Sequence, residues 1–189
     1  MTRDAGGAGL PRRGFGIRLA GDPAHGLLFS GYLLAEAALI DRRFVSHAPT
    51  LGAAARGALS GGSLRIASEH EEYPLVDAPE LLLVSSAPAL DRFADALAPE
   101  GSLLVDESLA EISPSYAIGL PLVRTAIEAG GTSLVVDLVA AAVVTAMTGA
   151  VSRRALYDAA ERLLPGRGRP AALAALDAGM EMGRSRLRA

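Results

Sequence analysis

Residues 17–43 read IRLAGDPAHGLLFSGYLLAEAALIDRR, and the order of residue types in this stretch decides the fold. An apolar run ends at Gly21, a short turn follows, and Gly26 stands just before a long segment with an apolar face. Between Leu27 and Leu39, apolar residues recur at helical spacing. The stretch therefore predicts a strand over residues 15–20 and a helix over residues 24–41, which together make one βα unit.

Further strand and helix signals alternate along the next part of the chain. Short strands are predicted over residues 43–46 and 63–68, and a fully covered strand over residues 80–86, between Pro79 and Pro88. A helix over residues 88–97 is followed by a turn and another covered strand within residues 99–108. This alternation predicts an α/β, Rossmann-like fold with a mostly parallel sheet flanked by helices.

The carboxyl-terminal part of the chain is predicted to be helical. Helices are expected over residues 121–129, 132–148, 152–163 and 170–183, with Ser152 as an N-cap and with Gly130, Gly149 and Gly183 where helices stop. The most apolar stretch, residues 133–150, carries Asp137 and is shorter than the about 20 residues of a membrane span. It predicts a buried helix and no membrane span.

The ends of the chain and its length predict one domain. Residues 1–13 contain glycine and proline but no apolar core of signal-peptide length, so they predict a flexible lead-in and a cytoplasmic protein. Residues 14–189 are long enough to bury one core, and we expect them to form a single domain.

The composition excludes several classes of function. Lys and Arg number 18 against 21 Asp and Glu, a formal net charge of -3, which argues against a nucleic-acid partner. Because the chain has no Cys, it cannot form disulfides, thiolate metal sites or iron–sulfur ligation of its own. Half of the residues are hydrophobic but only 4% are aromatic, which predicts a core of small aliphatic side chains.

The turn after the first strand has the length of a dinucleotide fingerprint but not its glycines. In G-x-G-x-x-G the middle glycine lets a pyrophosphate approach the backbone at a helix N-terminus. Pro23 stands at that position and removes an N–H donor, and Asp22 adds a negative charge beside it. We expect a strand-to-helix connection here, with an anion on the amides of residues 24–27 as the alternative.

Two loops carry the candidate binding residues. His25 either donates a hydrogen bond to an anionic ligand or caps the helix. Arg56 lies in an Ala- and Gly-rich loop, where its guanidinium either binds a phosphate or carboxylate in a bidentate way or makes a surface salt bridge. We expect both loops to leave the sheet at the same edge. The predicted rim of a ligand or partner cleft comprises Gly21, His25, Gly26, Gly52, Arg56 and Gly57.

Other polar clusters have a functional and a structural interpretation. Asp106, Glu107 and Ser108 follow a predicted strand, where they could serve acid/base chemistry or cap a helix. Ser85 and Ser86 end another strand, but no His is placed to act as their base, so no nucleophilic triad is predicted. Residues 68–73, SEHEEY, predict a solvated acidic turn and not a metal site.

Four motifs, in order, resemble one protein family. The turn at Gly21, followed by LLAEAA at residues 33–38, resembles a G-x-G-G-Q-G motif and its helix. Residues 51–69, LGAAARGALSGGSLRIASE, resemble Y-G-x-x-x-R-G-G ahead of a V-R-I-S strand. Residues 97–109 and 148–164 resemble L-K-P-G-G-x-L-I-x-(D/N)-S-S-L and T-G-x-V-S-x-E-x-L. Over about residues 14–183 the chain is similar to the gamma subunit, or gamma domain, of 2-oxoacid:ferredoxin oxidoreductases, which include the pyruvate, 2-oxoglutarate and indolepyruvate enzymes.

The chain departs from the family pattern mainly at the ligand-facing loops. Pro23, Ala24 and His25 replace two glycines and a glutamine of the first motif. Leu51 replaces the aromatic residue of the second motif and Ala58 its last glycine. Asp137 stands where the family has an asparagine in the late helical region.

The resemblance implies a subunit of a larger enzyme. In that family a 2-oxoacid is oxidatively decarboxylated on thiamine diphosphate, electrons pass through iron–sulfur clusters, and coenzyme A usually takes the acyl group. The gamma part implies partner subunits of alpha and beta type that hold these cofactors, so we expect no catalytic residue, metal or cofactor in this chain alone.

Two other interpretations stay open. In one, the altered loops record a lost role, and the chain is a stand-alone binding or scaffold domain that can form a homo-oligomer through its Ala-rich helices. In the other, it is an NAD-dependent enzyme. Pro23 opposes that, as does the absence of an acidic residue among Val45, Ser46 and His47.

Overall fold

Six strands form one mixed sheet. The structure, a computed structural model, describes residues 14–23, 27–51, 59–70, 73, 75–164 and 166–188. The strands are β1 (Phe15–Gly21), β2 (Phe44–Thr50), β3 (Ser60–Ala67), β4 (Leu81–Val84), β5 (Ser102–Asp106) and β6 (Ile118–Leu120). They lie in the order β2-β3-β1-β4-β5-β6. The pairs β1–β4, β4–β5 and β5–β6 are parallel, whereas β3 is antiparallel to both β1 and β2. The predicted mostly parallel sheet is confirmed, with β3 as the described strand that runs the other way.

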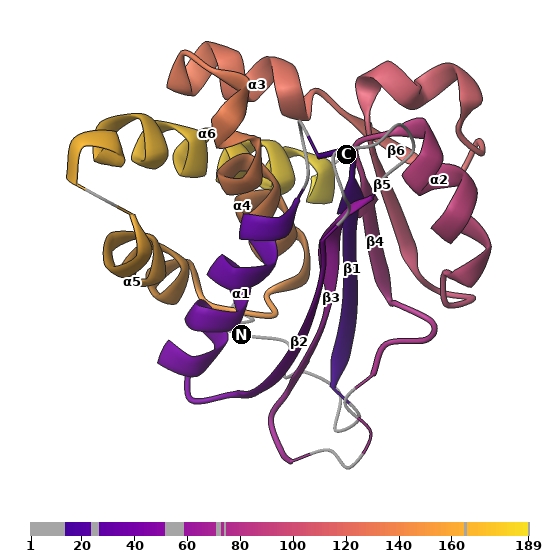
Figure 1. Cartoon of the computed structure of the whole chain (residues 1–189), viewed down its shortest axis with the longest axis horizontal. Helices are drawn as coiled ribbons and strands as arrows, with labels where there is room; N and C mark the ends of the chain where they lie inside the picture. The colour runs from indigo at the N-terminus through magenta and orange to yellow at the C-terminus, as the bar shows by residue number, and fades with distance from the viewer. Residues whose placement is uncertain are drawn as a thin grey trace, which may run out of the picture.

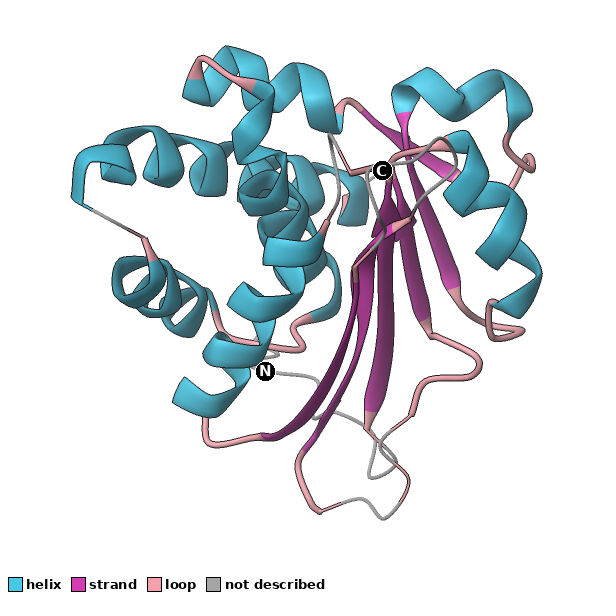
Figure 2. Ribbon diagram, viewed as in Figure 1, coloured by secondary structure: helices cyan, strands magenta, loops and turns pink. Residues whose placement is uncertain are grey.

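Helices cover the two faces of the sheet unequally (Figures 1 and 2). On one face, α1 (Leu28–Ile40) packs over β1, β3 and β2, and the helices of the carboxyl-terminal part extend this layer. On the other face, α2 (Ala87–Phe93) and the 3-10 turn η1 (Ala94–Ala96) cover β4, β5 and the end of β1. The apolar side chains of β1 and β3 that point toward α1, such as Ile17 and Leu64, are fully buried.

The carboxyl-terminal part is helical, as predicted. It comprises α3 (Leu122–Gly130), η3 (Ser133–Val135), α4 (Val136–Thr148), α5 (Arg153–Leu163), η4 (Gly166–Gly168) and α6 (Arg169–Leu187). A Cβ on Gly179 would lie 2.5 Å from the carbonyl oxygen of Val139, and one on Gly183 would lie 2.6 Å from the Cβ of Ala146. The prediction that Gly183 ends a helix is therefore wrong, because Gly183 lets α6 approach α4 and the helix continues to Leu187.

The other predicted helix ends are found at or within one residue of the expected positions. The Ser152 hydroxyl oxygen accepts a hydrogen bond from the backbone N–H of Ala155 at 3.1 Å, so Ser152 is the N-cap of α5. Gly149 ends α4 in the left-handed conformation with φ of 63°. Gly131, and not Gly130, ends α3 in the same way with φ of 73°.

Several strand and helix boundaries differ from the sequence-based expectations, and one strand was not expected. β2 runs on to Thr50, α1 begins at Leu28, and the short strand β6 was not predicted. Within the described part of the chain, no single helix is long and apolar enough to cross a membrane; Leu122–Gly130 and Ser133–Thr148 reach that length only together, with a bend of 114° between them.

Candidate functional site

The two predicted loops leave the sheet at the same end. The β-ladder pairs Gly21, the last residue of β1, with Ser60 at the start of β3, and it pairs Thr50, the last residue of β2, with Gly61. The segments that follow Gly21 and Thr50 therefore begin at the same end of the sheet, on either side of β3. Of the predicted cleft rim, Gly21 lies here, whereas the remaining members lie outside the described residues; these are His25, Gly26, Gly52, Arg56 and Gly57.

A carboxylate from the helical part binds the N-terminal turn of α1. The backbone N–H of Ser30 donates to Asp137 Oδ1 at 2.7 Å, and the Ser30 hydroxyl lies 3.0 Å from the same oxygen. The Ser30 hydroxyl also lies 2.9 Å from the Asp137 carbonyl oxygen, and the backbone N–H of Phe29 contributes another hydrogen bond to the carboxylate. Asp137 thus caps α1 from a neighbouring helix, in addition to standing in the first turn of α4.

This contact changes the electrostatics at the start of α1. Burial raises the pKa of the Asp137 carboxyl above its ordinary value, and the hydrogen bonds from Ser30 and Phe29 oppose that rise. The positive end of the helix dipole already faces an internal carboxylate, which repels a second anion. Together with Pro23 and Asp22, Asp137 makes the described part of this turn a poor phosphate site.

The acidic cluster after β5 caps helices. Asp106 is buried, and its Oδ1 accepts from the backbone N–H of Ser108 at 3.1 Å and from the Ser108 hydroxyl at 2.6 Å. Its Oδ2 accepts from the backbone N–H of Val123 at the start of α3, at 3.1 Å. Glu107 forms a two-pronged ion pair with Arg124, at 2.8 and 2.9 Å. Of the two interpretations of this cluster, the structure therefore confirms helix capping.

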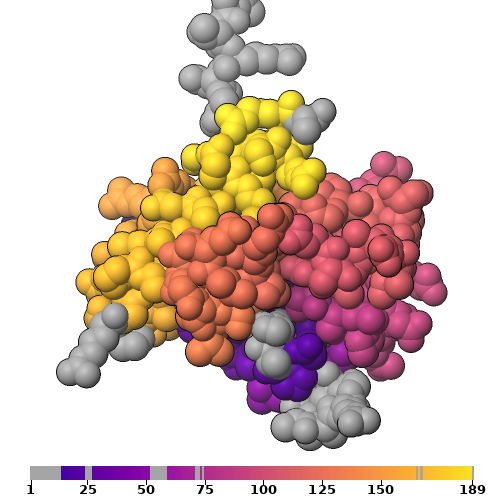
Figure 3. Space-filling model, turned by 90° about the horizontal axis from the view of Figure 1, so that it is seen from above, coloured from indigo at the N-terminus to yellow at the C-terminus, as the bar shows by residue number. Residues whose placement is uncertain are grey.

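This end of the molecule is covered by α3 and by the 3-10 segment η2 (Glu107–Ile112). Seen from above, α3 in orange lies between the yellow α6 and the pink segment that contains η2 (Figure 3). Asp106 holds the two together, because it accepts hydrogen bonds from the first turns of both. On the β5 side, η2 and α3 therefore lie over the sheet end, with an open pocket between them that Glu107, Ser108 and Val123 line.

Ser86 is not activated as a nucleophile by any described side chain. It occupies the N-cap position of α2, and its buried hydroxyl has no hydrogen-bond partner among the residues that the structure describes. A nucleophilic serine needs a base within hydrogen-bond reach.

One polar residue near this sheet end was not predicted. Arg18 lies in the middle of β1, half-buried on the face opposite α1, and lines a pocket with Phe93 of α2. A charged residue within the apolar run FGIRLAG was the available signal, because alternation along the strand places it on the face opposite Ile17 and Leu19.

Known proteins match nearly the whole chain. The sequence profile of the pyruvate ferredoxin/flavodoxin oxidoreductase family matches residues 16–182. The 2-oxoglutarate synthase subunit KorC of Methanothermobacter marburgensis is 32% identical over an alignment of 177 residues that covers 88% of this chain and 95% of that protein. The ketoisovalerate oxidoreductase subunit VorA of Methanothermobacter thermautotrophicus is 35% identical over 112 residues, 58% of this chain and 24% of that protein.

Solved structures share the fold. The gamma subunit of a keto/oxoacid ferredoxin oxidoreductase from Geobacter sulfurreducens superposes with a TM-score of 0.78 at 26% identity, covering 90% of this chain and 99% of that one. A 2-oxoglutarate:ferredoxin oxidoreductase from Magnetococcus marinus gives a TM-score of 0.79 at 18% identity, covering 93% of this chain and 32% of that one, and shows the shared fold. The resemblance seen in the motifs is confirmed: the chain belongs to the pyruvate ferredoxin/flavodoxin oxidoreductase family and corresponds, over nearly its whole length, to the gamma subunits of 2-oxoacid oxidoreductases.

Proposed function

We propose that this gamma-type subunit works in a complex with alpha- and beta-type catalytic subunits that carry thiamine diphosphate and iron–sulfur clusters. The family match over residues 16–182 is the observation that carries the proposal. Iron–sulfur clusters are held by Cys thiolates, and this chain has no Cys, so the clusters have to come from partners. In this complex the chain supplies an interface and holds no reacting group.

The first substrate to test is 2-oxoglutarate. The relatives that align over most of this chain are 2-oxoglutarate synthase subunits, whereas the ketoisovalerate relative aligns over a shorter part. We therefore propose oxidative decarboxylation of 2-oxoglutarate to an acyl-coenzyme A as the reaction of the complex, with ketoisovalerate as the second substrate to assay.

The loops at the sheet end are the part of this chain that we propose for contact with a ligand or a partner. The ladder pairs of Gly21 and Thr50 support this, because they start both loops at one end of the sheet. Arg56 offers a guanidinium that can fork onto a carboxylate or phosphate. The same proposed surface includes His25, whose imidazole can donate to an anion, and Gly21, Gly26, Gly52 and Gly57, which have no side chain to block an approach to the backbone.

The test is purification of the tagged chain from its host, with measurement of bound iron, thiamine diphosphate and coenzyme A-dependent 2-oxoacid oxidation. Arg56→Ala should lower activity or the yield of partners at an unchanged melting temperature. Arg154→Ala is the matched control, because Arg154 is nearly fully exposed and makes one i,i+4 ion pair at 3.7 Å with Asp158.

Two results would contradict the proposal. A cofactor-free homo-oligomer, recovered under conditions that keep other complexes intact, would favour a stand-alone scaffold domain. If Arg56→Ala and Arg154→Ala change activity and partner yield equally, Arg56 is not part of the contact surface.

A further inference from the structure

Arg18 is a half-buried cation in a strand interior. It pairs in the ladder with Ser63 of β3 and with Leu82 of β4, so it sits near the middle of the sheet. Its neighbours Ile17 and Leu19 point into the core under α1, and the side chain of Arg18 therefore lies on the opposite face. A guanidinium in this position has lost part of its hydration, and burial lowers the pKa of Arg18.

The contacts of Arg18 position the guanidinium without neutralising it. Its Nε donates to the Ser63 hydroxyl at 3.1 Å, its Nη2 donates to the Val76 carbonyl oxygen, and its Cζ lies 5.0 Å from the centre of the Phe93 ring. Among the described residues, no carboxylate lies within ion-pair distance of it. The charge of Asp77 acts on it from farther away, and that carboxylate accepts from the Tyr73 hydroxyl at 2.9 Å.

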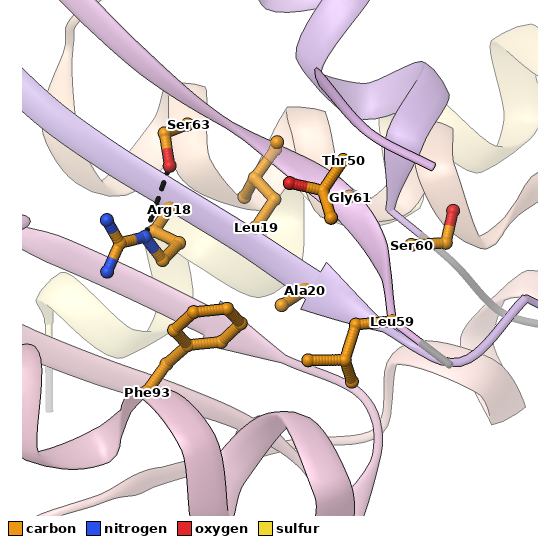
Figure 4. A pocket seen from close by; sticks show the side chains of 10 residues that line it. Arg18, Leu19, Ala20, Thr50, Leu59, Ser60, Gly61, Ser63 and Phe93 are labelled. Atoms are coloured by element: carbon orange, nitrogen blue, oxygen red, sulfur yellow. Dashed lines mark hydrogen bonds between the residues drawn. The ribbon is translucent and has the colours of Figure 1, made fainter. Parts of the chain in front are cut away.

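The guanidinium and the Phe93 ring line one pocket (Figure 4). The pocket has a volume of about 130 Å³, which is below the range of pockets for drug-sized ligands and leaves room for a small one. The side chains of Arg18 and Ser63 form one wall, and those of Phe93, Leu59 and Ala20 lie across from it. Thr50, Ser60, Gly61 and Gly62 complete the lining.

We propose that this pocket binds a small organic carboxylate, with the carboxylate on Arg18 and the carbon chain against Phe93 and Leu59. The guanidinium carries more N–H donors than its two contacts use, and its planar fork fits a carboxylate. One cation matches one carboxylate, whereas the apolar wall gives a bare phosphate nothing to pack against. The inference goes beyond the subunit role, which assigns no ligand to the face of the sheet opposite α1.

The backbone beside the pocket is fixed by packing. Gly61 has φ of 155°, and a Cβ there would overlap the backbone carbonyl of Leu19. Gly61 therefore lets β3 approach β1 closely at this side of the pocket. Because residues 60–63 line the pocket, their amides report on binding there.

The test is an NMR titration of the ¹⁵N-labelled full chain with 2-oxoglutarate, ketoisovalerate and inorganic phosphate at constant ionic strength. We expect saturable shifts of the amides of residues 60–63 and 93 with the two carboxylates, at millimolar concentration or below. Arg18→Gln should weaken the binding of both carboxylates about tenfold or more, because it removes a charged hydrogen-bond donor. Arg92→Gln is the matched control: Arg92 also faces the Phe93 ring, at 5.8 Å, but does not line the pocket.

The wild-type titration alone can overturn the proposal, so it does not depend on whether Arg18→Gln folds. Three results would refute it. The shifts do not saturate at millimolar carboxylate, they are confined to other parts of the chain, or phosphate binds as well as the carboxylates. Binding that Arg18→Gln leaves unchanged would refute it as well. Since the isolated chain is measured, these outcomes are separate from failure to find partner subunits.

Discussion

Replacing Asp137 by alanine should destabilise the protein by removing the cap of α1. The carboxylate accepts hydrogen bonds from the backbone N–H groups of Ser30 and Phe29, and Ser30 is fully buried. Leaving a buried donor without a partner costs about 1–3 kcal/mol. Removing the carboxylate also relieves the desolvation that raises its pKa, which offsets part of that cost.

The net loss works out at about 2 kcal/mol, which corresponds to a decrease in melting temperature of about 4–8 °C for a chain of this size. Asp137→Asn should cost less than about 1 kcal/mol, because the amide oxygen still accepts from Ser30 while no charge is buried. The assay is urea unfolding followed by circular dichroism at neutral pH.

Asp91→Ala is the matched control, because Asp91 is an exposed residue of α2, and it should change stability by less than about 0.5 kcal/mol. Two results would refute the capping account. One is an Asp137→Ala variant as stable as the control, and the other is an Asp137→Asn variant as unstable as Asp137→Ala.

Three further changes test other parts of the fold. Burial lowers the pKa of His47, so its neutral form is favoured in the folded state. The free energy of unfolding should therefore fall as the pH drops through about 6.5, where the His of the unfolded chain becomes protonated. Urea titrations at several pH values should show a smaller fall in the His47→Phe variant. Gly179→Ala should lower the free energy of unfolding by about 1–3 kcal/mol, because the added methyl group forces α6 away from α4. Gly119→Ala should be tolerated, because a Cβ there meets open space. Equal melting temperatures of the two variants would contradict this. Arg42 follows Asp41, the C-cap of α1, and has φ of 57°, a conformation that favours glycine. Arg42→Gly should therefore raise the free energy of unfolding by about 0.5–1 kcal/mol, while Arg43→Gly should lower it. A loss of stability in Arg42→Gly would show that the side chain of Arg42 matters more than its backbone conformation.

The sequence predicted the elements of the fold better than their arrangement. The apolar runs located β1, β4 and β5, and the helical spacing located α1 and the carboxyl-terminal helices. Periodicity reports which residues are buried but not the direction of a strand, so the antiparallel placement of β3 could not be predicted. Gly183 has the residue type of a helix stop, yet its place against α4 decides its role.

The candidate site was predicted only in part. The sequence indicated that the strands before the two loops end at the same edge of the sheet, as the ladder pairs of Gly21 and Thr50 show, and it singled out Asp137 as unusual for the family. It could not show that Asp137 reaches Ser30, because the two are far apart in the chain and meet only when α4 packs on α1. Arg18 was visible as a charge in an apolar strand, but its place beside Phe93 depends on how α2 covers the sheet.

The most direct test of the subunit role is affinity purification of the tagged chain from its host, followed by identification of the bound proteins and assay of the eluate for thiamine diphosphate, iron and 2-oxoglutarate oxidation. We expect a stable complex in which the cofactors belong to other subunits and this chain is present in equal amount to them. A chain recovered alone, or only with copies of itself, under conditions in which other complexes of the host survive, would contradict that role.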